Sequence, residues 1–166
     1  MGNNGFKRVL AIVLAATCML VFSFSATFAA SPSPQSGTMK GADDSSYTYS
    51  IPANSDTGTA ALAKVYKKSI KSKTVYGTVS YNGATCKITT IKKNAFKGCK
   101  KLKTLNIKDK YLKKVQKGAF NGATKLKTIK IYKSKVGGKT KAKKIKKLLQ
   151  KGMTAKQKKK IKIKIV

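Results

Sequence analysis

Apolar positions follow one pattern twice between residues 88 and 131. The first copy, residues 88–107, reads ITTIKKNAFKGCKKLKTLNI, and the second, residues 112–131, reads LKKVQKGAFNGATKLKTIKI. At this offset of 24 residues an Ala-Phe pair, a glycine and a closing L-x-x-L-x-L pattern coincide. A repeat at a fixed offset indicates structural units that stack, because one unit alone cannot bury its apolar edge.

The end of each copy alternates as a short strand does, with Leu105 and Ile107 pointing inward. The two phenylalanines, Phe96 and Phe120, supply a bulky apolar side chain to each copy. The predicted core of residues 73–166 therefore comprises Ile91, Phe96, Leu102, Leu105, Ile107, Val115, Phe120, Leu126, Ile129 and Ile131.

The outward positions of the two strands form a candidate binding face. They are Thr104, Asn106 and Lys108 in the first copy and Thr128, Lys130 and Tyr132 in the second. Stacking sets the strands about 4.8 Å apart, so hydroxyl, amide, ammonium and aromatic groups become neighbours. This mixture suits an acidic glycan or a protein surface. The alternative is that these are only solvated strand positions.

The flanks of the repeat predict closing elements. Asn82-Gly83, between the alternating segments 74–81 and 84–88, is a strong hairpin signal that pairs Tyr81 with Ala84. The segment 139–151 has apolar residues at helical spacing, and isoleucines then alternate at positions 161, 163 and 165. We expect a hairpin that covers the first copy and a helix plus strand that close the last. A membrane-surface helix is the alternative for 139–151.

The repeat resembles a known family. The pattern I-x-x-I-x-x-x-A-F-x-G-C-x-x-L-x-x-L-x-I is similar to that of the BspA-type leucine-rich repeat family of bacterial secreted and surface proteins. Its cysteine is Cys99 in the first copy and Ala123 in the second, and Lys92 and Gln116 stand where the family usually has glycine. The resemblance implies a β-rich (α+β) leucine-rich-repeat solenoid, here of about two full repeats with an N-terminal hairpin cap and a C-terminal helix-plus-strand cap. It also implies adhesion or protein binding.

The beginning of the chain indicates export. Lys7 and Arg8 precede an apolar run over residues 9–24 and then small residues near Ala30, which is the plan of a cleaved signal peptide over residues 1–30. We expect a secreted, extracellular or cell-surface protein with no transmembrane span after cleavage. An uncleaved anchor and lipidation at Cys18 are alternatives, although Thr17 fits lipidation poorly.

The remaining chain divides in two by composition. Residues 31–59 are rich in Ser, Thr, Gly and Pro, and we expect a disordered linker there. Basic and acidic residues balance over residues 1–62, so the whole charge excess lies in a lysine-rich repeat domain, residues 60–166. Cys86 and Cys99 remain after signal cleavage, and we expect two separate buried thiols rather than one disulfide.

Charge and composition constrain the function. The chain has 38 basic against 4 acidic residues, a formal charge of +34, no His and no Glu. General acid-base catalysis therefore lacks its usual side chains, and we expect no enzyme, cofactor or metal site. The lysines favour anionic partners such as cell-wall polymers, acidic glycans or host surface proteins. A cationic nucleic-acid-binding or membrane-active protein is the alternative, although nucleic acid would be bound only nonspecifically because the sole arginine is Arg8.

Overall fold

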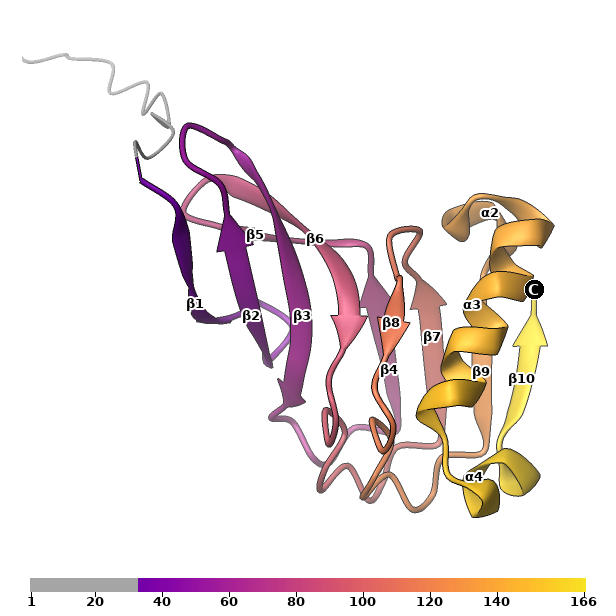
Figure 1. Ribbon diagram of the computed structural model, residues 1–166. Helices are drawn as coiled ribbons and strands as arrows, with labels where there is room; N and C mark the ends of the chain where they lie inside the picture. Colours follow the sequence, from indigo (N-terminus) through magenta and orange to yellow (C-terminus); the bar gives the residue numbers. More distant parts are fainter. Residues whose placement is uncertain (1–32) are drawn as a thin grey trace, which may run out of the picture.

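Two β-sheets enclose the core of the molecule (Figure 1). The computed structural model describes residues 33–166. The first sheet has the strand order β1-β2-β3-β6-β5, and the short strand β8 also pairs with β6. Its strands are β1 (Gln35–Lys40), β2 (Ser45–Ile51), β3 (Thr57–Val65), β5 (Thr78–Tyr81), β6 (Ala84–Ile91) and β8 (Lys114–Val115).

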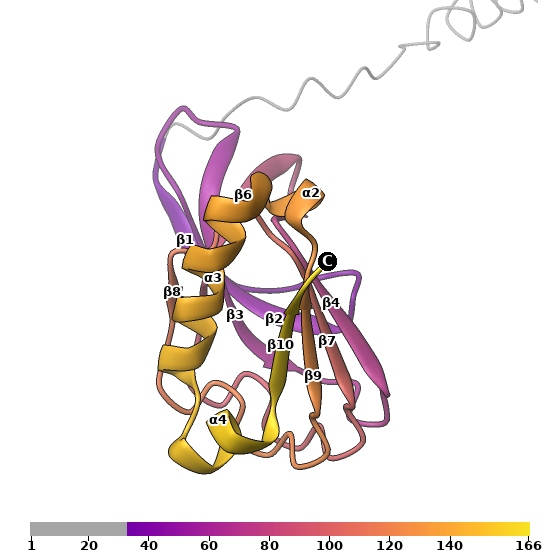
Figure 2. The same ribbon diagram turned by 90° about the vertical axis from the view of Figure 1, so that its right-hand side faces the viewer.

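The second sheet is parallel and has the strand order β10-β9-β7-β4. Its strands are β4 (Ser72–Tyr76), β7 (Thr104–Lys108), β9 (Thr128–Ile131) and β10 (Lys162–Ile165). The chain passes back and forth between the sheets, from β3 to β4, from β6 to β7 and from β8 to β9. After β9, helix α3 (Gly138–Gly152) lies beside β8, and the chain then enters β10 (Figure 2).

The two sequence copies stack at the expected offset. Leu105 pairs with Ile129 in the second sheet, and Ile91 pairs with Val115 in the first. Both parallel ladders therefore keep the copies in phase. All ten predicted core residues are buried, which confirms the inward phase of the pattern.

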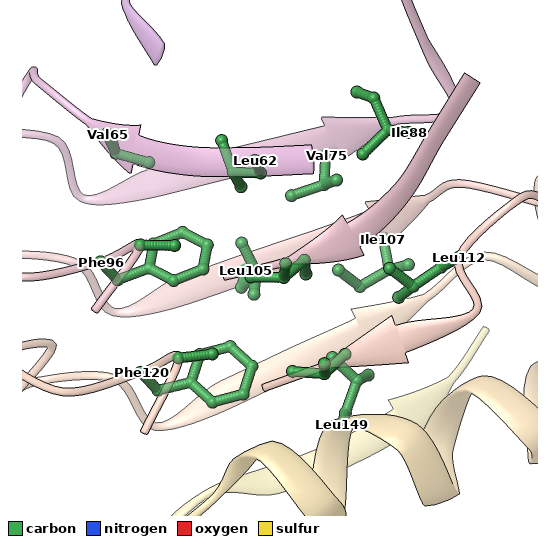
Figure 3. Packing of buried hydrophobic residues seen from close by; sticks show 14 of the residues in the cluster. Leu62, Val65, Val75, Ile88, Phe96, Leu105, Ile107, Leu112, Phe120 and Leu149 are labelled. Carbon is green, nitrogen blue, oxygen red and sulfur yellow. The ribbon is translucent and has the colours of Figure 1, made fainter. Parts of the chain in front are cut away.

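Turns between the sheets carry the phenylalanines. Phe96 and Phe120 are fully buried, and their rings stack with centroids 5.6 Å apart (Figure 3). The Phe96 N–H also donates to the Ala119 carbonyl at 3.2 Å. Close stacking explains a glycine of the motif, because a Cβ on Gly122, whose φ is +83°, would lie 2.7 Å from the backbone nitrogen of Gly98. Side chains and backbone thus hold successive turns in contact.

The predicted hairpin is present but sits elsewhere in the fold. Tyr81 pairs with Ala84 and Val79 with Cys86, and Asn82 and Gly83 both have positive φ. However, β4 leaves for the second sheet before the hairpin begins, and β3 occupies the other edge of β6. The hairpin is therefore an extension of β6, and its expected role as the cover of the first copy is wrong.

The expected disordered linker is also wrong over its described part, residues 33–59. Strands β1 and β2 and the start of β3 occupy it as an antiparallel meander. The reason is a sparse set of apolar anchors, since Met39, Tyr47 and Ile51 join the core while Ser and Thr fill the strand positions between them. The folded domain therefore begins well before residue 60.

An ion pair between the buried Lys73 and the more exposed Asp43 connects this meander to the second sheet. Lys73 occupies the inward position that Leu105 and Ile129 fill in the neighbouring strands. Its ammonium donates to both the Asp43 carboxylate and the Asp43 carbonyl at 2.7 Å. Burial alone would raise the pKa of Asp43, but Lys73, the Tyr47 hydroxyl and the Ser45 N–H together hold it below its usual value.

The C-terminal elements agree with the sequence. The predicted helix is α3, with Ala142, Ile145 and Leu149 buried, and the alternating isoleucines form β10. Two short helices were not expected, namely α2 (Lys133–Val136) and α4 (Ala155–Lys160). A reciprocal capping box between Thr154 and Gln157 begins α4.

The remaining expectations concern the thiols and the N-terminus. Cys86 and Cys99 are both free and buried, as expected, and burial raises the pKa of each thiol. The predicted signal peptide, residues 1–30, lies outside the described residues. Within residues 33–166, no helix has the length and apolarity needed to cross a bilayer.

Candidate binding face

The second sheet presents three rows of side chains away from the core. We call these rows the sheet face. Their register follows from the parallel pairing of β4, β7, β9 and β10. The first row is Ser72, Thr104, Thr128 and Lys162, the second is Thr74, Asn106, Lys130 and Lys164, and the third is Tyr76, Lys108, Tyr132 and Val166.

The structure brings all six predicted face residues together. Thr104 pairs with Thr128 and Asn106 with Lys130, and each of the four side chains is half-buried. The Lys108 ammonium lies 5.0 Å from the centroid of the Tyr132 ring, within the range of a cation–π contact. The outward phase assigned from the sequence is therefore correct, whereas binding at this face remains a prediction.

Six further residues, contributed by the strands at either side, extend the sheet face beyond the sequence prediction. Strand β4 adds Ser72, Thr74 and Tyr76, and the β10 side adds Lys162, Lys164 and Val166. The alternation of inward and outward residues in both segments was visible in the sequence. This alternation does not show which strand lies beside which, so the sequence could not place these residues on the same face. The Asn106 amide donates to the Ser72 hydroxyl at 3.3 Å, so β4 also contacts the predicted residues directly.

Positive charge increases across the sheet face toward β10. Strand β4 contributes no outward lysine, β7 and β9 contribute Lys108 and Lys130, and β10 contributes Lys162 and Lys164. None of these four ammonium groups has an acidic partner among residues 33–166. Their charge is therefore available to an anion from outside.

The carboxyl group nearest to this row in sequence does not neutralise it. Asp109 follows Lys108 directly, but its side chain is fully buried. Burial raises the pKa of this carboxyl group to about 7, against the lowering effect of the Tyr111 and Leu112 N–H groups. The sheet face consequently offers hydroxyl, amide, phenol and ammonium groups, which are binding groups rather than an acid-base pair.

One hollow lies beside the second repeat turn, and another lies at the edge of the second sheet, where Lys71 and Lys103 directly precede Ser72 and Thr104 of the first row. The first, of about 400 Å³, is formed between the second repeat turn and α4, with Ala123, Leu126 and Ile161 among its lining. Its amide and ammonium groups are partly occupied, since Gln157 donates to the Phe120 carbonyl and Lys160 to the Thr124 carbonyl. The other, of about 270 Å³, is lined by Lys71, Lys101, Lys103 and Lys125.

Comparison with known families agrees with the stacked geometry. A family model described as "BspA type Leucine rich repeat region (6 copies)" matches residues 67–145. The chain carries a BspA-type leucine-rich repeat region. This region includes β4, β7 and β9 and all six predicted face residues, of which Tyr132 directly follows β9. Neither the curated proteins nor the solved structures provide a match to the chain.

The family match extends the repeat beyond the two copies that are obvious in the sequence. The BspA-type region begins before β4, and β4 and β7 pair in the same parallel manner as β7 and β9. The β-rich repeat fold expected from the sequence is thus present.

Proposed function

We propose that this protein is a non-enzymatic adhesion or interaction protein that works outside the cytoplasm and binds an anionic partner through the sheet face. Its repeat region forms a short solenoid that supports this face. The observation that carries the proposal is the group of four lysines on adjacent parallel strands with no acidic partner among the described residues. The family supports the same class, because BspA-type repeats are typical of interaction and adhesion proteins.

The placement of α3 supports binding rather than membrane disruption. A membrane-active helix needs its apolar side free to enter the lipid. In α3 that side is buried in the core through Ala142, Ile145 and Leu149. The helix would have to leave the core to act on a bilayer, and the apolar area of these side chains opposes that step.

Charge removal on the sheet face tests the proposal. Lys130→Ala with Lys164→Ala removes the ammonium groups of two neighbouring residues. Lys130 of β9 and Lys164 of β10 are partners in the strand register. The control, Lys143→Ala with Lys147→Ala, removes two exposed ammonium groups from α3. We expect the face variant to lose about tenfold or more in affinity for isolated cell walls, and the control to remain within about twofold.

Salt separates a local site from diffuse attraction. Attraction by the overall charge of +34 weakens similarly whichever lysines are removed, because it acts over a Debye length of about 8 Å at physiological ionic strength. Affinity is measured by a pull-down over cell walls and host matrix components across a salt series. Equal losses from both variants at every salt concentration would mean that the sheet face is not a discrete site.

The proposed location gives a separate prediction about the N-terminus. If residues 1–30 are a cleaved signal peptide, the mature protein begins near Ala30 or Ser31 and is found outside the cytoplasm. Mass spectrometry of the native protein measures its first residue. Recovery of an intact Met1 start in the membrane fraction would instead identify an uncleaved anchor.

A further inference from the structure

The third row of the sheet face includes two exposed large apolar side chains. Among residues 33–166, three large apolar side chains are exposed: Tyr66 by 45%, Tyr76 by 55% and Val166 by 43%. Tyr76 and Val166 lie at opposite ends of the third row. Tyrosine combines an apolar ring with a polar hydroxyl group, and for this reason it is enriched at contact surfaces.

The order along this row follows from the strand register. Tyr76 pairs with Lys108, and the Lys108 ammonium lies 5.0 Å from the Tyr132 ring. The Lys133 N–H donates to the Val166 carbonyl at 2.8 Å, which places Val166 beyond Tyr132. Two strand spacings, about 10 Å, therefore separate Tyr76 from Tyr132, and one ammonium group belongs to the strand between them.

We propose that Tyr76, Lys108 and Tyr132 bind a linear polysaccharide that carries carboxylate groups. This inference rests on the proposed function and names the ligand of the same sheet face. An aromatic ring has a negative face, and the C–H groups on one side of a sugar ring are weakly positive, so sugar rings contact the exposed Tyr76 ring and the part of the half-buried Tyr132 ring that the Lys108 ammonium leaves open. The Lys108 ammonium pairs with a carboxylate of the chain between those contacts, as a point charge does.

The second row supports a polysaccharide rather than a protein partner. Protein interfaces draw most of their energy from apolar or aromatic anchors at a desolvated centre. The centre of the sheet face holds Asn106 and Lys130 of the second row, with Thr128 of the first row beside them. The aromatic residues of the face lie in the third row, along one side. Sugar hydroxyl groups can hydrogen-bond to these central amide, hydroxyl and ammonium groups while the rings contact the tyrosines.

The charge along the row argues for a carboxylated sugar rather than a nucleic acid. Proteins that bind single strands pair stacking residues with basic groups that follow the backbone continuously. Here one lysine, Lys108, lies on the strand between those that carry the two aromatic residues, and the adjacent strand β4 contributes only Ser72, Thr74 and Tyr76 to the face. The row offers one ammonium group for two tyrosine rings. This ratio suits a polysaccharide in which contacts with the sugar rings, rather than with the charged groups, determine how the chain lies on the row.

The chain contains a matched control for this row. Tyr66 is exposed like Tyr76, and the Lys64 ammonium lies 5.2 Å from its ring. Lys64 lies at the end of β3 in the first sheet, and Tyr66 directly follows that strand. This lysine–tyrosine pair is therefore not part of the sheet face. It therefore reproduces the chemistry of Lys108 and Tyr132 without the row.

The experiment measures affinity for polygalacturonate, for its fully methyl-esterified neutral form, for inorganic polyphosphate and for single-stranded DNA at one ionic strength. The variants are Tyr76→Ala with Tyr132→Ala, Lys108→Met, and Tyr66→Ala as the control. Contacts between aromatic side chains contribute up to about tenfold in affinity, and we expect a sugar–tyrosine contact to be of that size. We expect the double variant to lose about 30-fold or more for polygalacturonate, and Tyr66→Ala to change affinity less than about twofold.

The other ligands and Lys108→Met test the assigned roles. Lys108→Met should weaken polygalacturonate and leave the weaker affinity for the esterified polymer unchanged, because only the carboxylate contact is lost. Polyphosphate affinity should change less than about twofold in the double tyrosine variant. Circular dichroism and the thermal midpoint of each variant confirm that the loss does not reflect unfolding.

Three results would overturn the inference. In the first, the double tyrosine variant keeps its polygalacturonate affinity while Lys130→Ala with Lys164→Ala still reduces it. This result would exclude the third row as the binding site but would leave the proposed function standing. A larger tyrosine effect on single-stranded DNA than on polygalacturonate would assign the row to bases. Wild-type affinity of both the Lys130 and Lys164 variant and the double tyrosine variant for every anionic polymer would refute the proposed function and this inference together.

Discussion

Replacing Phe96 or Phe120 with alanine is expected to lower the free energy of unfolding by about 3–5 kcal/mol. Both rings are fully buried, and each stacks on the other at a centroid distance of 5.6 Å. Removing either ring leaves a cavity between successive turns of the repeat. Because the turns also hydrogen-bond through their backbones, the surrounding chain cannot close the cavity without breaking those bonds.

Chemical denaturation measures this effect, with Tyr66→Ala as an exposed aromatic control that should change the free energy by no more than about 0.5 kcal/mol. The double variant should cost a different amount from the sum of the single variants, since the two rings share one contact. Wild-type stability of both single variants would show that the rings are not structural partners in a stack.

The sequence predicted the repeat well because its spacing is uniform where the two copies meet. Residues 24 apart, such as Leu105 and Ile129, pair directly in the structure. The inward phase then determines the outward phase, so the position of Thr104, Asn106, Thr128 and Lys130 on one face followed without knowledge of the sheets. Strand alternation alone was sufficient for that step.

The earlier layer of the stack was missed because the hairpin interrupts the spacing. Strand β4 pairs with β7 as Ser72 with Thr104, a larger separation than the offset between the copies. The inserted strand β5 accounts for the difference, and a comparison at constant offset cannot detect it. Tyr76 was assigned to the hairpin for the same reason, and its place beside Lys108 became visible only with the register of β4.

The folded state of residues 33–59 was hidden by composition. Ser and Thr are frequent in linkers, but they also occupy solvent-facing positions in strands. In β2 the pattern SSYTYSI places Tyr47 and Ile51 in the core, and β3 pairs with both β2 and β6. A segment with few apolar residues can fold when a neighbouring sheet offers a strand for it to pair with. The stabilisation from that pairing cannot be recognised in the segment's own sequence.

The buried carboxyl group of Asp109 should make the protein less stable as the pH rises from about 4 to about 7. Its Oδ1 accepts from the Tyr111 N–H at 2.7 Å, whereas its Oδ2 has no hydrogen-bond partner among the described residues. Burial raises its folded-state pKa to about 7, while the pKa of an unfolded aspartate is close to its ordinary 3.8. The folded protein therefore retains a proton that the unfolded chain has released throughout this range.

The sign and size of the effect follow from proton linkage. Because the folded state binds more protons than the unfolded state between these two pKa values, the free energy of unfolding falls with increasing pH and becomes level above about 7. A shift of about three pKa units corresponds to a loss of roughly 4 kcal/mol. Asp43 acts in a different range, since its lowered pKa means that its contribution is lost only as the pH falls below about 4.

Asp109→Asn isolates this group, because the asparagine side chain can keep an oxygen for the Tyr111 N–H and has no charge at any pH. Urea denaturation at pH 5 and pH 8 measures the free energy of unfolding of both proteins. We expect the wild type to lose several kcal/mol between these values and Asp109→Asn to change by less than about 1 kcal/mol, so the variant should be the more stable protein at pH 8. The large positive charge of the chain is present in both proteins and cancels in the comparison. Equal wild-type stability at the two pH values would mean that the Asp109 carboxylate is solvated in the folded state, contrary to its complete burial.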